Sequence, residues 1–233
     1  MNDKTVLIKK YNANDVHKFP IRMHEVWRYA GYAGAVDEVD EELKKVFNEI
    51  KEELKSAIKF QVCYLRLPIS WEKGMPVLPF EAESKGLAGC LAGSDEIVMF
   101  AATIGLEIDR HIAKYKRFSP VKALLMHAYG AERIESLCDY FCEEIKKESL
   151  EKGKFTTARF SPGYGDLRIE KQKDFFRLLD CSRNAGISLN ESLLMTPSKS
   201  VTAIFGIGCN VNEKNRHNCN TCNKEECEYK KTN

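Results

Sequence analysis

A long helical pattern in the second half of the chain places the strongest limit on the fold. Pro120 opens a stretch that continues to about residue 152. Apolar side chains recur in it at steps of three and four residues, as on the buried face of an amphipathic helix. They are Leu124, Leu125, Ala128, Ile134, Leu137, Cys138, Phe141 and Ile145. Gly130 lies inside this helix and is expected to soften or bend it.

The remaining elements predict a mixed fold. Helical patterns cover residues 39–58, 84–92, 107–115 and 169–181, and residues 21–34 read as a short helix or folded loop. Strands are predicted at 4–9, 58–67, 96–103 and 201–206. Helices and strands alternate only irregularly, so we expect an α+β fold, a mainly antiparallel twisted sheet packed with helices. Gly206 and Gly208 lack the third glycine and following helix of a dinucleotide fingerprint.

Composition excludes several classes of protein. The chain has 233 residues, 43% hydrophobic and 30% charged, which allows a core without disulfides. A net charge of +2 gives no strong attraction to nucleic acid or anionic membranes. No apolar run reaches the length of a membrane span, and the first residues lack a secretory signal. We therefore expect a cytoplasmic protein that binds neither nucleic acid nor membrane.

The C-terminal segment differs from the rest and carries a cysteine pattern. We divide the chain into a domain at 1–208 and a cysteine-rich tail at 209–233. Cys209, Cys219, Cys222 and Cys227 include a C-x-x-C pair in a polar stretch, and His217 could replace one thiol. Such a segment has little apolar surface to bury, so a bound metal would supply its folding energy. Zinc and an iron–sulfur cluster both fit, and the alternative is a tail of unbound thiols.

The hexapeptide at 159–164, Arg-Phe-Ser-Pro-Gly-Tyr, is the strongest candidate for a ligand site. The planar fork of Arg159 suits a carboxylate. The Pro162-Gly163 pair would hold the backbone open for a ligand. Tyr164 offers a flat face to a cation or a purine. Taken alone, the hexapeptide is more typical of an ordinary turn with a surface arginine and a packing tyrosine.

Its surroundings favour the ligand site. Residues 132–152 precede the hexapeptide, and Leu-Leu-Met-Thr-Pro-Ser at 193–198 with Ser-Val-Thr at 200–202 follow it. Together they resemble the activation domain of cobalamin-dependent methionine synthase, which binds S-adenosylmethionine through an Arg-x-x-x-Gly-Tyr stretch. The resemblance covers residues 20–208 loosely and 123–206 best. It implies that Arg159, Ser161 and Tyr164 contact S-adenosylmethionine, with Gly163 in the same binding turn.

The chain departs from the family pattern at three points. Ser161 replaces an alanine. Residues 165–167, Gly-Asp-Leu, replace Pro-Ala-Cys-Pro, which leaves the far wall of the site undefined. The family also has an N-terminal aspartate near the amino group of the ligand, which has no aligned counterpart here.

The resemblance implies a role in the reductive methylation of cobalamin. In the family, the domain docks over the cobalamin module, an external reductant supplies an electron, and S-adenosylmethionine supplies the methyl group. The chain lacks the Asp-x-His-x-x-Gly signature of that module. We therefore expect a free-standing protein without catalytic residues of its own, which serves a separate cobalamin-binding methionine synthase polypeptide. The electron donor would be a flavodoxin or ferredoxin.

Two other functions stay open from the sequence. In the first, an iron–sulfur or zinc tail is itself the function, as an electron donor or partner-binding module for another corrinoid protein. In the second, the chain is a methyltransferase acting on another substrate, although it lacks the glycine-rich loop of the common methyltransferase fold.

Overall fold

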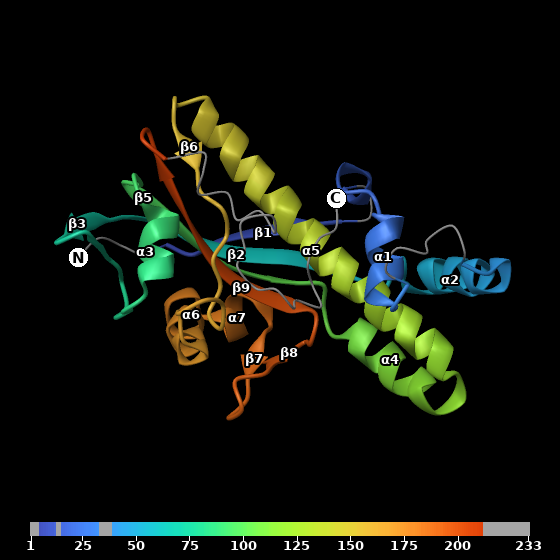
Figure 1. Ribbon diagram of the computed structural model, residues 1–233. Helices are drawn as coiled ribbons and strands as arrows, with labels where there is room; N and C mark the ends of the chain where they lie inside the picture. Colours follow the sequence, from blue (N-terminus) through green and yellow to red (C-terminus); the bar gives the residue numbers. More distant parts are fainter. Residues whose placement is uncertain (1–4, 13–14, 33–38, 212–233) are drawn as a thin grey trace.

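The computed structural model describes residues 5–12, 15–32 and 39–211 (Figure 1). The elements are, in chain order, β1 (Leu7–Tyr11), the 3₁₀ turn η1 (Val16–Lys18), α1 (Met23–Tyr29), α2 (Glu41–Leu54), β2 (Phe60–Pro68), β3 (Ser70–Glu72), β4 (Met75–Val77), α3 (Lys85–Leu91), β5 (Glu96–Thr103), α4 (Glu107–Phe118), α5 (Pro120–Leu150), β6 (Phe155–Thr156), η3 (Ile169–Lys171), α6 (Gln172–Leu179), α7 (Cys181–Ala185), β7 (Ser188–Leu189), β8 (Met195–Thr196) and β9 (Ser200–Gly208).

A five-stranded antiparallel sheet forms the centre of the described structure. Its strand order is β1-β2-β5-β9-β6. The register across the three long strands places Tyr64 opposite Phe100, and Phe100 opposite Ala203. Each pair of adjacent strands in this sheet is antiparallel. The expected α+β class with a mainly antiparallel sheet is therefore confirmed.

Both faces of the sheet are covered by helices, which explains the apolar run in β5. Val98 and Phe100 face a core shared with α1, α2, α4 and α5. Ile97 and Met99 face a second core shared with α3, α6 and α7. Because successive side chains of a strand point to opposite faces, a strand covered on both sides carries apolar residues at every position.

The long helix α5 crosses the first face of the sheet and packs against α1, α2 and α4 (Figure 1). It begins where expected: Ser119 accepts a hydrogen bond from the amide of Lys122, and Pro120 occupies the first turn. The helix continues through Gly130. A Cβ atom at Gly130 would lie 2.5 Å from Cδ1 of Ile108 and 3.1 Å from Cγ of Lys199, so this glycine permits close packing.

Several short elements were not expected. The hairpins β3–β4 and β7–β8 and the short strand β6 contain two or three residues per strand, too few for a periodic pattern. The helix predicted over 169–181 is divided, because Asp180 has a left-handed φ of 44° between α6 and α7. None of the helices in the described ranges is both long and apolar enough to cross a membrane.

Candidate functional site

The segment before α6 lies along the outer edge of the sheet and carries Arg159. Phe160 and Ile204 exchange two backbone hydrogen bonds of 2.8 Å, which extends the pairing of β6 with β9. The Phe160 ring enters the core formed with α3 and α6. Its neighbour Arg159 is directed to the opposite side, where it meets α5. Successive side chains of an extended segment point to opposite sides, so Arg159 points to α5 while Phe160 points into the core.

Arg159 is paired with two carboxylates of α5. Its Nη2 donates to Oδ1 of Asp139 at 2.7 Å and to Oε2 of Glu135 at 3.2 Å. Burial alone would lower the pKa of Arg159. Cys138, Cys142 and the two carboxylates outweigh it, so the pKa lies above its ordinary value and the guanidinium stays charged. Its Nη1 is shielded from solvent and has no hydrogen-bond partner within the described structure. A buried charged donor without a partner is costly, and a ligand acceptor would explain it.

A second arginine, Arg22 in the segment before α1, binds the carboxylate of Asp139. Nη1 of Arg22 donates to Oδ2 of Asp139 at 2.8 Å, so Asp139 lies between Arg22 and Arg159. Nε and the backbone amide of Arg22 donate to Oε1 of Glu132 at 3.2 and 3.1 Å. The segment before α1 is therefore tied to α5 by charge-assisted hydrogen bonds.

A fully buried ion pair supports this attachment. Arg133 and Glu132 are 0% exposed, and Nε of Arg133 donates to Oε2 of Glu132 at 2.6 Å. Arg133 also donates to the carbonyl oxygens of Phe19 and Pro20, at 2.9 and 3.0 Å. Both charges are thus paired and hydrogen-bonded, as burial requires. The pair fixes the backbone of residues 19 and 20 and so places Arg22.

Residues 161–164 form a tight turn after Arg159. The amide of Tyr164 donates to the carbonyl of Ser161 at 3.1 Å, with Pro162 and Gly163 between them. Gly163 has a φ of 91°, and Pro followed by a residue of positive φ is the signature of a type II turn. Tyr164 is 70% exposed at the end of this turn. The turn therefore presents the tyrosine to solvent.

Asp166 attaches the other end of the loop to α3. Its carboxylate accepts from the Ser84 hydroxyl and from the amides of Lys85 and Gly86, at 2.7 and 3.2 Å for the amides. The Ser84 hydrogen bond, with these amides, holds the pKa of Asp166 below its ordinary value. This contact gives a structural role to the segment at 165–167 that departs from the family pattern. Residues 159–167 are thus held at both ends, by α5 and by α3.

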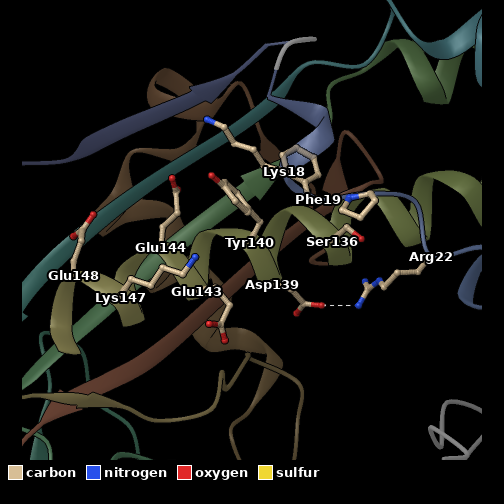
Figure 2. Close-up of a pocket in the computed structure, with 11 residues that line it drawn as sticks. Lys18, Phe19, Arg22, Ser136, Asp139, Tyr140, Glu143, Glu144, Lys147 and Glu148 are labelled. Carbon is tan, nitrogen blue, oxygen red and sulfur yellow. Dashed lines mark hydrogen bonds and ion pairs between the residues drawn. The ribbon is translucent and has the colours of Figure 1, made fainter. Parts of the chain in front are cut away.

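A groove of about 620 Å³ lies beside Asp139, between α5 and the segment around residues 18–22 (Figure 2). Its lining combines both signs of charge with two aromatic rings: Lys18, Phe19, Pro20, Arg22, Ser136, Asp139, Tyr140, Glu143, Glu144, Lys147 and Glu148. Figure 2 shows Arg22 directed at Asp139 at one end. Asp139 therefore belongs both to the groove and to the ion pair of Arg159.

Sequence reasoning identified part of this arrangement. Arg159, Ser161, Gly163 and Tyr164 lie in one loop, with Ser161 partly buried and Gly163 exposed. Arg22, Glu135 and Asp139 were not predicted from the sequence. One signal was present: the two acids stand four residues apart on a predicted helix and so share one face. Only the fold shows that this face meets Arg159.

Of the four predicted metal-binding cysteines, the described residues include Cys209. Cys209 is exposed and free, just after the last residue of β9. Cys219, Cys222 and Cys227, with His217, lie outside the described residues. Within the described ranges, no group of three or more His, Cys, Asp or Glu side chains could hold a metal ion. The division at residue 208 and the ligand set stay predictions.

Comparisons with known proteins connect this geometry to a family. The family model described as "Vitamin B12 dependent methionine synthase, activation domain" matches residues 88–232. Thirteen chains of solved structures match as well. One is a crystal structure of the MetH reactivation domain bound to AdoHcy, with a TM-score of 0.68 and 16% sequence identity. The match covers 88% of this chain and 79% of that one, and shows that the two share a fold. None of the curated proteins matches the chain.

Proposed function

The chain belongs to the family of vitamin B12-dependent methionine synthase activation domains, and from this premise we propose that it binds S-adenosylmethionine at Arg159 and supports the reductive methylation of cobalamin. The observation that carries the proposal is the partly buried guanidinium of Arg159, whose Nη1 has no hydrogen-bond partner in the described structure. A ligand carboxylate would satisfy this donor, and the arginine fork suits that group.

The surroundings of Arg159 fit the other parts of the ligand. The exposed ring of Tyr164 can stack on adenine or lie against the sulfonium. Ser161, which is partly buried, and Gly163, which is exposed, lie in the same turn. The groove beside Asp139 has the volume of a small-ligand pocket and the rings of Phe19 and Tyr140. S-Adenosylhomocysteine, which is bound in the related MetH domain, lacks the methyl group and the sulfonium charge but keeps the amino-acid end and the adenosine, and is a suitable probe.

The reaction itself requires a partner. We propose that the cobalamin is carried by a separate methionine synthase polypeptide and that a flavodoxin or ferredoxin supplies the electron. The cobalt of that cofactor supplies the nucleophile for the methyl group. The residues of this chain would bind the methyl donor and hold it in place, and such positioning alone can lower a barrier by several kcal/mol.

Calorimetric titration of S-adenosylmethionine tests the ligand site. We expect binding to the unaltered protein and a loss of at least about tenfold in affinity for Arg159→Ala, since a charged hydrogen-bonded contact is removed. Arg168→Ala is the matched control, because Arg168 is an exposed arginine of the adjoining segment that pairs only with Glu170 within the described residues. Its affinity should equal that of the unaltered protein.

The same preparations test the reaction. With a separately produced cobalamin-binding methionine synthase and a reductant, the unaltered protein should accelerate methylation of cob(II)alamin, and Arg159→Ala should not. Absence of S-adenosylmethionine binding at millimolar concentration would overturn the proposed function. Binding without acceleration would contradict the role in cobalamin methylation alone.

A further inference from the structure

An amine and an imidazole lie together where α5 passes over the start of β9. Nζ of Lys199, the residue before β9, lies 3.1 Å from Nε2 of His127 on α5. We propose that Lys199 is a site of covalent acylation by acyl phosphates, with His127 as the acceptor of the proton that the amine loses. The proposed function does not use this pair, so either proposal can fail without the other.

Lys199 is a buried cation that lacks a paired carboxylate. The residue is 6% exposed, and within the described structure its Nζ contacts His127 and forms no ion pair. Asp109 of α4 is the acidic group that acts on it. The Asp109 carboxylate, however, accepts from the backbone amide of Ser198 at 2.7 Å and from the Ser198 hydroxyl. A buried ammonium without such a pair favours the loss of its proton.

The packing against α5 leads the lysine side chain along the helix to an exposed residue. A Cβ atom at Gly130 would lie 3.1 Å from Cγ and 3.2 Å from Cε of Lys199, so the helix backbone covers the aliphatic stem. His127 precedes Gly130 by one turn and is exposed. Nζ therefore lies beside an exposed side chain. Because so little of the lysine itself is exposed, the proposal is for a short acyl group such as acetyl.

The charges around Nζ favour a nucleophilic amine and a neutral imidazole. Burial lowers the pKa of Lys199 to about 8, against a smaller opposite effect of Asp109. Burial, followed by the charge of Lys199, lowers the pKa of His127. Near pH 8 the imidazole is therefore neutral and able to take up a proton. Desolvated lysines beside a second basic group are those that act as nucleophiles in proteins.

The reaction needs the acyl phosphate and no further reagent. Nζ in its amine form attacks the carbonyl carbon, the N–C bond forms, and the C–O bond to the phosphate breaks. Phosphate leaves with the electron pair, and the proton released from Nζ passes to Nε2 of His127 and then to solvent. The amide product is neutral, so it removes the charge that burial disfavours. Its N–H can still donate to His127. Alkylation would keep the charge, so the site favours acylation.

Acetylation of the unaltered protein by acetyl phosphate tests the site. The acetyl content of each lysine is followed over time by peptide mass spectrometry at a series of pH values. At pH 8 about half of Lys199 is unprotonated, against less than about 1% of an ordinary lysine. The lower basicity of the amine offsets part of this advantage. We expect Lys199 to react at least about tenfold faster than Lys173, an exposed lysine of α6.

The pH profile gives a second readout, which a merely accessible lysine would not share. The rate at Lys199 should level off above about pH 9, where its amine is fully unprotonated, whereas the rate at Lys173 should continue to rise. If Lys199 reacts no faster than Lys173, or if its rate rises without levelling, the proposal is wrong. This comparison uses the unaltered protein and does not depend on the folding of a variant.

His127→Gln tests the proton acceptor. Glutamine keeps a hydrogen-bond acceptor near Nζ but cannot take up a proton at this pH. We expect the acetylation rate at Lys199 to fall at least about tenfold, the lower end of what a general base contributes, and the rate at Lys173 to stay the same. The urea midpoint shows whether the variant is folded. An unchanged rate at Lys199 in the folded variant would contradict the role of His127.

Discussion

Lys199 is a buried cation at the start of β9, where α5 passes over the sheet. The residue is 6% exposed, and its Nζ lies 3.1 Å from Nε2 of His127. Burial lowers the pKa of Lys199 from 10.5 to about 8, against a smaller opposite effect of Asp109. Burial and the Lys199 charge also lower the pKa of His127. At neutral pH the folded protein therefore keeps a lysine charged where burial disfavours the charge.

This burial predicts a pH dependence of stability. The folded pKa of Lys199 lies below the unfolded one, so between pH 8 and 10.5 the unfolded chain binds more protons and stability rises with pH. We expect Lys199→Met to increase the free energy of unfolding at pH 7 by about 1–3 kcal/mol, since one pKa unit corresponds to about 1.4 kcal/mol. This advantage should shrink as the pH rises from 8 to 10.5.

Urea unfolding of both proteins at a series of pH values measures the effect. The exposed Lys173→Met is the matched control and should differ little from the unaltered protein at every pH. If the stability gained by Lys199→Met is the same at every pH of the series, the charge of the lysine is not the cause of the gain.

At the scale of residues, the sequence indicates which side chains have suitable chemistry better than it indicates which side chains they contact. Arg159 stood out because a Pro-Gly turn and a tyrosine follow it directly. Glu135 and Asp139 were not predicted as site residues, since nothing near them in sequence shows what they contact. Arg22 is more than one hundred positions from Asp139, so their ion pair depends on a tertiary contact that no local pattern contains.

At the scale of elements, Gly130 shows how one position of α5 sets a packing distance. Alanine has a higher helix propensity than glycine by about 1 kcal/mol, so an exposed site would gain stability from the change. Here the added Cβ would lie 2.5 Å from Cδ1 of Ile108, which is fully buried. We expect Gly130→Ala to lower the free energy of unfolding by about 1–3 kcal/mol, the usual cost of overpacking, as measured by urea unfolding.

A second substitution identifies the cause. Ile108→Val removes the Cδ1 atom that the new methyl would meet. In this background, Gly130→Ala should cost less, with a coupling of at least about 0.5 kcal/mol in the double-mutant cycle. Additive effects of the two changes would contradict the packing explanation.

The long elements were predictable and the short ones were not. The strand expected over 96–103 matches β5, and the helix expected from 120 to about 152 matches α5 within two residues. Each has enough residues for a periodic or continuous apolar signal. Strands of two or three residues such as β6 and β8 carry no period, and their pairing follows from the loops that the core holds in place.

At the scale of the whole molecule, the proposed ligand site and the predicted metal site are separate in the chain. Arg159, Glu135 and Asp139 rest on α5 and on the edge of the sheet. The layered core continues to the end of β9 at Gly208, and Cys209 follows it as an exposed residue. Within the described structure, Cys209 forms no disulfide.

Metal removal tests this separation. We predict that the purified protein, prepared without oxygen, contains zinc or an iron–sulfur cluster, measured by elemental analysis and visible absorption. Cys222→Ser should lose the metal, whereas Cys142→Ser, a cysteine of α5 outside the predicted set, should keep it. Because the core ends before Cys209, chelation should leave the thermal midpoint and the S-adenosylhomocysteine affinity unchanged. Purified protein that contains no metal would contradict the predicted metal site. Unfolding of the domain by a chelator would show that the tail stabilises the core.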